Sequence, residues 1–396
     1  MIVTDWATTP EPAILNIFSF IEQHLCYDAA LVCKKWYNCF TSAANWTHVK
    51  LVFDNVDSYD PFQLRLIDLY GVAIKSLDIS VNQGIEWNRT LLSKCLYLAV
   101  VRCVKLEKLR IAFVGENPLF YAGKEFFEPL IALFSRHDAA AILRKLDFGK
   151  MPIMLNDTIF DPFLSQSHIS NLQYLNIQNR QLVCKISPEL MIQLVHCCRS
   201  LEDLRCYHSS FYEASAQLFL EPNRRPLKHL SLLSQSQDKH TFVPIPAGTW
   251  AALSSKFPAF RVTLKFNARC PSRILRDTLQ PTIPVQHLFL ECYSIRTRVH
   301  EELAIVAQNY GNCIEKLVVQ SQPSEALDQM LLLVIAAATM LRSLHVLCIL
   351  DTRTIEIIGR TYPEHVKSVD FTLKDTYDPH PWVSDDVLDK LFVPGW

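Results

Sequence analysis

A recurring apolar pattern is the feature that most constrains the fold of this chain. In one segment after another, large apolar residues occupy positions i, i+3 and i+5, and a helix-like stretch follows. Ile74, Leu77 and Ile79 form one such set. The same spacing begins again at Leu106, Leu143, Leu172, Leu201, Leu227, Val285, Ile314, Leu341 and Val366. So many occurrences indicate an internal repeat whose unit is one short strand and one helix.

The spacing between the units indicates which repeat this is. Leu143, Leu172 and Leu201 are each separated by 29 residues, which is typical of leucine-rich repeats that contain a full helix. We therefore predict an α/β fold, an irregular leucine-rich-repeat horseshoe with a parallel inner sheet and outer helices. The gap between residues 232 and 285 is too long for one unit. It predicts a degenerate repeat with a strand over residues 261–266.

The residues at i+2 and i+4 of each strand should line the inner wall of this sheet, because side chains alternate along a strand. Lys108, Arg110 and Lys145 fall at such positions on neighbouring strands. They are candidates to receive an acidic or phosphorylated segment, and a solvated polar wall is the competing interpretation. Phe289 is an outward aromatic residue of the type that anchors interfaces. The remaining candidates for substrate binding are Tyr174, Arg205, His229 and Trp396.

The N-terminal segment is short and unusually apolar. Ile14, Phe18, Ile21 and Leu25 recur at helical steps and predict one helix. A second helix follows, but a module of about 40 residues can rarely hide so much apolar surface by itself. Part of this surface should therefore face another domain or another protein.

The order of residues in this segment resembles the F-box. Thr9-Pro10 is followed by IFSFI at residues 17–21, by VCKKW at residues 32–36, and by Trp46. The resemblance implies a three-helix module over residues 7–48 that docks on the Skp adaptor, which is held by a cullin scaffold carrying a RING subunit. By position, the residues that would contribute to or support this interface are Pro10, Ile14, Leu15, Phe18, Val32, Cys33 and Trp36. The competing interpretation is that these residues only form a small local core.

The resemblance and the repeats together predict a non-catalytic receptor. It would be the substrate-recognition subunit of an SCF-type E3 ubiquitin ligase complex, in which the F-box binds the adaptor and residues 49–374 bind an unknown protein substrate. The substrate would then be ubiquitinated and degraded by the proteasome. Residues 375–396 should form a C-terminal cap or tail. The alternative is a non-ligase leucine-rich-repeat scaffold with a degenerate F-box, because Thr9 stands where the F-box usually has leucine.

Composition and motifs disfavour other classes of function. A formal net charge of -1 provides no general field toward nucleic acid or an anionic membrane, and residues 330–341 are too few to cross a bilayer. We find no enzyme motif and no zinc-ligand spacing among the 13 cysteines, and therefore expect no catalysis, cofactor or metal. An odd number of cysteines without a signal peptide predicts reduced thiols and a cytoplasmic and/or nuclear location.

Overall fold

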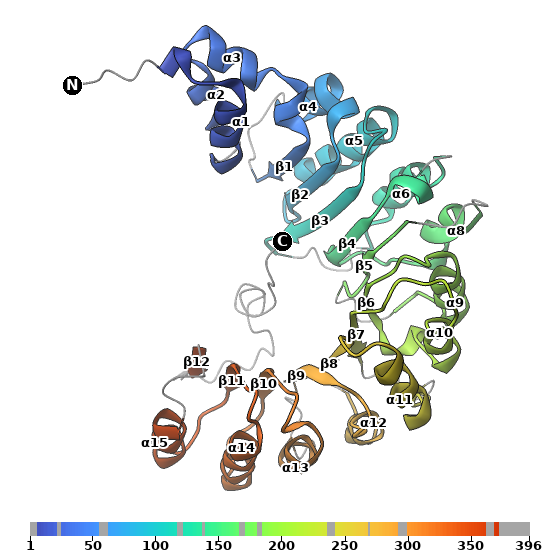
Figure 1. Ribbon diagram of the computed structural model, residues 1–396, viewed down its shortest axis with the longest axis vertical. Coiled ribbons are helices and arrows are strands. Elements are labelled where there is room, and N and C mark those ends of the chain that lie inside the picture. The colour runs from blue at the N-terminus through green and yellow to red at the C-terminus, as the bar shows by residue number, and fades with distance from the viewer. Residues whose placement is uncertain are drawn as a thin grey trace. The chain divides into compact units, whose positions relative to one another are not determined.

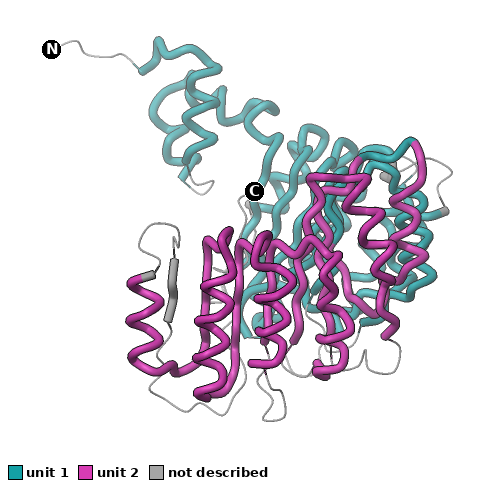
Figure 2. The backbone as a smooth tube through the Cα atoms, turned by 60° about the horizontal axis from the view of Figure 1, so that its bottom comes forward, with its two compact units in different colours: residues 1–204, 223–225 teal, residues 205–222, 226–396 magenta. Residues whose placement is uncertain are grey.

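The repeat pattern folds as parallel strands that alternate with helices. The computed structural model describes residues 6–21, 25–54, 62–116, 122–136, 139–165, 171–179, 184–235, 242–267, 270–291, 299–361 and 368–371. The chain divides into two compact units (Figure 2). Unit 1 comprises residues 1–204 and 223–225, and unit 2 comprises residues 205–222 and 226–396.

Unit 1 begins with a small helical module. Its elements are the 3₁₀ turn η1 (Trp6–Thr8), the helices α1 (Glu11–Phe20), α2 (Cys26–Ala30) and α3 (Lys34–Phe40), and the 3₁₀ turn η2 (Ala43–Trp46). Pro12 lies in the first turn of α1, where the missing amide hydrogen has no intrahelical partner to lose. The prediction of one helix reaching Leu25 is wrong, because the backbone of Ile21 is extended and α1 ends at Phe20.

The repeats of unit 1 follow this module. Their strands are β1 (His48–Phe53), β2 (Ser76–Asn82), β3 (Lys108–Val114), β4 (Lys145–Lys150), β5 (Tyr174–Asn176) and the start of β6 (Asp203–Tyr207). Between the strands lie α4 (Phe62–Tyr70), η3 (Gly71–Ala73), α5 (Glu86–Arg102), η4 (Lys124–Phe126), α6 (Phe127–Phe134), α7 (Ala139–Ile142), α8 (Asp157–Ser165) and α9 (Pro188–Cys197). Strands β1 to β5 are parallel and pair in chain order. Within unit 1 the helices lie along one face of the strands (Figure 1).

A repeated hydrogen-bond pattern sets the register between neighbouring repeats. The carbonyl oxygen of the residue at i+1 accepts the backbone amides of residues i+1 and i+2 of the next repeat. The Lys75 carbonyl thus accepts from Glu107 and Lys108 at 2.8 and 2.9 Å, and the Glu107 carbonyl accepts from Arg144 and Lys145 at 2.7 and 3.0 Å. Each strand therefore starts at the same height as its neighbour, and the apolar positions align in layers.

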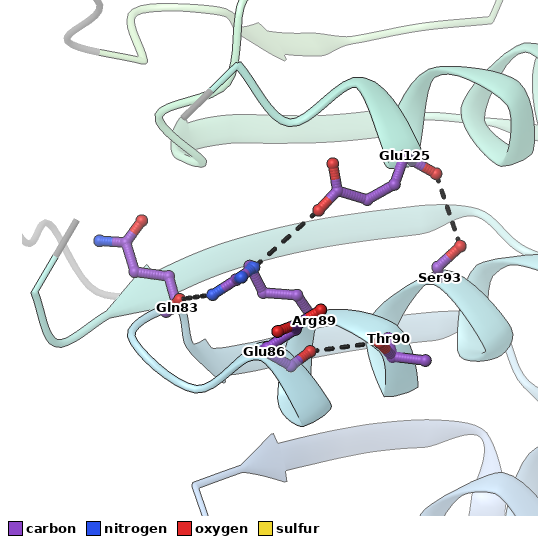
Figure 3. Close-up of polar contacts among 6 residues, drawn as sticks. All are labelled: Gln83, Glu86, Arg89, Thr90, Ser93 and Glu125. Carbon is purple, nitrogen blue, oxygen red and sulfur yellow. Dashed lines mark hydrogen bonds and ion pairs between the residues drawn. The ribbon is translucent and has the colours of Figure 1, made fainter. Parts of the chain in front are cut away.

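A half-buried arginine connects two neighbouring repeats of unit 1 (Figure 3). Arg89 on α5 donates to the carbonyl of Gln83, and its Nε lies 4.0 Å from a carboxylate oxygen of Glu125 on η4. Ser93 also donates to the backbone carbonyl of Glu125 at 3.5 Å. These contacts tie the loop after β2 and the helix α5 to the start of the following helical segment.

Unit 2 continues the same architecture. Its strands are the end of β6, then β7 (His229–Ser234), β8 (Arg261–Phe266), β9 (Val285–Glu291), β10 (Lys316–Gln320), β11 (Ser343–Leu347) and β12 (Ser368–Phe371). Its helical elements are η5 (His208–Ser210), α10 (Glu213–Leu218), α11 (Ala247–Lys256), α12 (Ser272–Thr278), α13 (Val299–Tyr310), α14 (Glu325–Ala337) and α15 (Thr352–Thr361). Strands β7 to β12 are parallel and pair in chain order. The predicted degenerate repeat is confirmed, because β8 occupies residues 261–266.

The apolar pattern forms the core between sheet and helices. Leu77, Ile79, Leu109 and Ile111 are buried, whereas the intervening i+2 and i+4 residues of β2 and β3 are half-buried on the other face. The α/β class and the leucine-rich-repeat fold with a parallel sheet are thereby confirmed. The domain limits at residues 48 and 374 stay predictions. Residues 375–396, including Trp396, lie outside the described residues.

Candidate adaptor and substrate interfaces

Three of the predicted adaptor residues form the core of the N-terminal module. Ile14, Phe18 and Trp36 are buried, and the rings of Phe18 and Trp36 meet edge to face with centroids 5.7 Å apart. The Trp36 indole donates to the carbonyl of Trp6 at 3.2 Å. These three side chains therefore offer almost no surface to a partner in the free module, and their role at an adaptor interface stays a prediction. Their side chains point inward and hold the helices together, so of the two predicted roles the structure is compatible with support of the interface.

Trp46 joins the module to the first repeat. Its indole is 2% exposed, donates to the Phe40 carbonyl at 2.8 Å and meets the Phe40 ring edge to face. On its other side it stacks on Tyr70, with centroids 5.4 Å apart and an interplanar angle of 18°. One side chain thus closes the core of the module and contacts the C-terminal end of α4. The module is fixed to the array through an aromatic contact.

The other predicted adaptor residues reach the surface. Val32 and Pro10 are exposed, and Leu15 and Cys33 are half-buried. Further apolar residues that the sequence prediction missed are also exposed on the module. The additional large apolar residues exposed on the module are Trp6, Phe20, Leu25, Tyr27, Leu31 and Tyr37. The signal was present in the sequence, since each lies in a short apolar helix or at its end, off the helical face that the core residues occupy.

The predicted cation trio of unit 1 is only partly assembled. Lys108 and Lys145 are register partners on β3 and β4, as predicted. Arg110, however, donates to both carboxylate oxygens of Asp78 on β2, at 2.9 and 3.1 Å. A carboxylate held this close largely offsets the charge of the guanidinium. The prediction of three cations converging on one anion is therefore wrong for Arg110.

A second carboxylate organises the next two strands of unit 1. Asp147 is buried and accepts hydrogen bonds from the side chain of Asn176 at 2.9 Å and the hydroxyl of Tyr174 at 3.3 Å, and from the amide of Gly149. The ammonium group of Lys145 lies 6.0 Å from the centroid of the Tyr174 ring. Tyr174 is thus half-buried within a polar network, and the inner face of unit 1 carries charges of both signs.

The inner face of unit 2 has a different character. Arg205 and His229 are half-buried at the predicted inward positions. Phe289 also lies at its predicted position on β9, but its side chain is only 3% exposed. The ammonium groups of Lys265 and Lys316 lie 5.8 and 5.7 Å from the centroid of its ring. The prediction of an exposed aromatic anchor is therefore wrong, because two lysines flank a ring that solvent barely reaches.

One histidine and one serine of unit 2 lie at hydrogen-bond distance. His208 and Ser234 form a close pair, with Nδ1 and Oγ 2.9 Å apart, but both side chains are at most 2% exposed. Burial lowers the pKa of His208 to about 4, so the imidazole is neutral at physiological pH. No three metal-ligating side chains converge anywhere in the described ranges. Among the same residues, no helix has the length and apolarity that a bilayer crossing requires.

Comparison with known proteins gives one consistent result. No model of a protein family matches the chain. Three relatives, each named F-box/LRR-repeat protein 8, match it over almost its whole length: the human protein is 25% identical over 375 residues, the bovine protein 26% over 376 and the mouse protein 25% over 375. In each case the match covers 94% of this chain and 96% of the relative. The three-helix module with its exposed apolar surface, the parallel repeat array that follows it and relatives matched over 94% of the chain together support an F-box protein with leucine-rich repeats.

Proposed function

We propose that this protein is the non-catalytic substrate-recognition subunit of an SCF-type ubiquitin ligase complex. Its F-box module, which we place at residues 7–48, binds an Skp adaptor and through it a cullin and a RING subunit. Its repeat array, residues 49–374, binds a protein substrate, and residues 375–396 form a C-terminal tail. Ubiquitination and proteasomal degradation of the substrate follow from proximity to the loaded E2, which raises the effective concentration of substrate lysines. A cytoplasmic or nuclear location is part of the proposal.

One observation carries this proposal. The core of the module is already complete, because Phe18, Trp36, Phe40 and Trp46 pack on one another. The module nevertheless exposes large apolar side chains, among them Phe20, which is 82% exposed. Apolar surface that a module does not need for its own core is typical of a protein interface. Its place on the F-box supports the adaptor as the partner.

The scaffold alternative rests on Thr9, which replaces the usual leucine of the family. Trp6, three residues earlier, supplies apolar surface beside this position. Its ring lies 6.1 Å from that of Trp36, edge to face, and 55% of the residue is exposed. This indole is far larger than the leucine that is missing. The contact therefore favours an F-box that binds its adaptor over a degenerate one.

Co-purification with the Skp adaptor tests the proposal. Leu31 and Val32 are 63% and 57% exposed between α2 and α3, so Leu31→Asp with Val32→Asp removes interface area without opening the core. We expect the wild-type chain to retain the adaptor and this double variant to lose it. Leu69→Asp with Val101→Asp is the matched control, because these residues are 71% and 67% exposed outside the module. Trp36→Ala is a poor probe, since it removes a core residue.

Two results would contradict the proposal. A wild-type chain that retains no adaptor removes the ligase function, and equal retention by both double variants removes the module as its binding site. The scaffold alternative predicts that substrates bound by the array keep their half-life when the protein is depleted. Cell fractionation with a tagged chain tests the proposed location.

A further inference from the structure

Helix α5, the longest in the described part of unit 1, has two apolar faces. One face is buried against the sheet, and its residues are Leu91, Leu92, Cys95, Leu96 and Ala99. A helix on the outside of a repeat array normally carries polar residues on its other face, because water covers it. The outer face of α5 departs from this rule, since Trp87, Tyr97 and Val101 are 40%, 42% and 67% exposed.

The exposed side of α5 has the spacing of a coiled-coil seam. Trp87, Thr90, Lys94, Tyr97 and Val101 follow one another at steps of three, four, three and four residues, and all five are exposed. Residues at these steps form one line along a helix, and it is through such a line that one helix packs on another. The outer face of α5 therefore has the pattern that a second helix lying along it requires.

The helical segment before α5 widens this apolar face. Leu69 on α4 and Val72 on η3 are exposed, and between them Gly71 lies directly against Arg102 at the end of α5. Asp68 forms an ion pair with Arg102, with Oδ1 and Nη2 2.7 Å apart. These contacts join the two helices, so their exposed residues belong to one surface. We define the outer seam as Leu69, Val72, Trp87, Thr90, Lys94, Tyr97 and Val101.

Exposed apolar residues do not gather in this way on the other helices of the repeats. Among the described helices after α5, the large apolar residues that are exposed are Leu333 on α14 and Ile357 on α15. Single exposed apolar residues of this kind are normal on a protein surface. A group of them on two joined helices is typical of an interaction site.

The central residue of the outer seam indicates which kind of partner fits. Lys94 is exposed seven residues after Trp87 and seven before Val101, and its ammonium group lies 5.1 Å from the centroid of the Trp87 ring. If the seam paired along its length with that of a second copy, Lys94 would meet the same lysine in either orientation, and like charges repel. An acidic residue at the facing position would attract it. Charge therefore favours a different protein over a second copy.

We propose that the outer seam binds an amphipathic helix of another protein, with apolar residues at alternating steps of three and four and an acidic residue opposite Lys94. Within unit 1 the helices lie on one face of the sheet (Figure 1). A helix bound to the outer seam therefore does not occupy the inner face of the strands. This binding site is additional to the adaptor and substrate sites proposed above.

Fluorescence anisotropy with the full chain and two designed peptides tests the inference. Each labelled peptide is a monomeric amphipathic helix of three heptads, with apolar residues at positions a and d. One peptide has glutamate at its central a position, and the other has lysine there. We expect the wild-type chain to bind the glutamate peptide about threefold more tightly, which is the scale of an exposed ion pair. Lys94→Glu should reverse this preference, and loss of folding cannot produce a reversal.

A pair of double variants locates the binding site. Leu69→Asp with Val101→Asp should weaken binding of the glutamate peptide by at least about tenfold, because it places two charges in the apolar seam. The matched control is Leu31→Asp with Val32→Asp, which places the same charges on the F-box module and should change peptide binding less than about twofold. The two variants have the opposite expected effects on adaptor retention. Failure of this inference is thus distinguishable from failure of the proposed function.

Four results would overturn the inference. The first is failure of the wild-type chain to bind either peptide, and the second is equal loss of peptide binding in the two double variants. The third is a peptide preference that Lys94→Glu leaves unchanged. The fourth is a concentration-dependent dimer in analytical ultracentrifugation that Leu69→Asp with Val101→Asp dissociates, which would assign the outer seam to a second copy.

Discussion

Replacing Trp46 with alanine should release the N-terminal module from the first repeat. The indole is 2% exposed and makes three separate contacts, a hydrogen bond of 2.8 Å to the Phe40 carbonyl, an edge-to-face contact with the Phe40 ring and a stacked contact with Tyr70. Each contact links the module to its own last helix or to α4. No other described residue bridges Phe40 and Tyr70 through aromatic contacts.

The magnitude follows from burial and from the size of the module. Truncating a buried tryptophan to alanine costs about 3–5 kcal/mol. A core of about 40 residues rarely provides more than about 3–5 kcal/mol by itself. The expected loss therefore matches or exceeds the local stability of α1 to α3, and the module should unfold while the repeats stay folded. Trp46→Phe should cost less, because it keeps a ring against Phe40 and Tyr70 and loses one hydrogen bond worth about 1 kcal/mol.

Hydrogen exchange followed by mass spectrometry measures this directly. In Trp46→Ala the amides of α1, α2 and α3 should exchange at least about tenfold faster than in the wild type, whereas those of β9 to β11 should be unchanged. Adaptor retention should fall in parallel. If the amides of α1 to α3 keep their wild-type protection, the module is stable without its contact to Tyr70 and the reasoning is refuted.

Two further predictions concern unit 2. Burial lowers the pKa of His208 from 6.5 in the unfolded chain to about 4 in the folded chain, so the unfolded state binds the proton first as the pH falls. The free energy of unfolding should therefore decrease by about 1 kcal/mol between pH 7 and pH 5.5. Urea titrations of His208→Phe should show a correspondingly smaller decrease. Gly311→Ala should lower the free energy of unfolding by about 1–3 kcal/mol, because a Cβ at this position would lie 2.6 Å from the Ala337 carbonyl oxygen. Gly248→Ala is the control and should be neutral or stabilising, because a Cβ there would have no atom within 4 Å. Equal urea midpoints for the two variants would contradict this prediction.

The interfaces were less predictable than the fold, and particular residues show why. Val32 was predicted to contribute to the adaptor surface and is exposed, but its neighbours Leu31 and Tyr37 were missed. Trp36 and Phe18 have the same apolar character and lie inside. A short helix that is apolar on several sides does not reveal which side its neighbours cover. That information comes from how α1, α2 and α3 pack on one another.

The partners of charged residues on the inner face were equally unpredictable from the sequence. Arg110 and Lys316 both occupy inward strand positions, and their sequence contexts give no reason to rank one above the other. Arg110 is held by Asp78 from the neighbouring strand, 32 residues earlier in the chain. Lys316 lies against Phe289 from the preceding repeat. Partners of this kind are set by the register between repeats, which no single segment contains.

The amino-acid sequence by itself determined the repeat. The apolar spacing i, i+3 and i+5 arises because each strand buries these side chains in a core, and it can be recognised within a single segment of the chain. The register between neighbouring repeats is set by the two backbone amides that each i+1 carbonyl accepts. This register aligns residues from separate repeats. Only that tertiary alignment decided which apolar side chains of the module remain outside, and where two lysines meet on one ring. Burial and ion pairing depend on neighbours that are distant in the chain, so they belong to the folded structure alone.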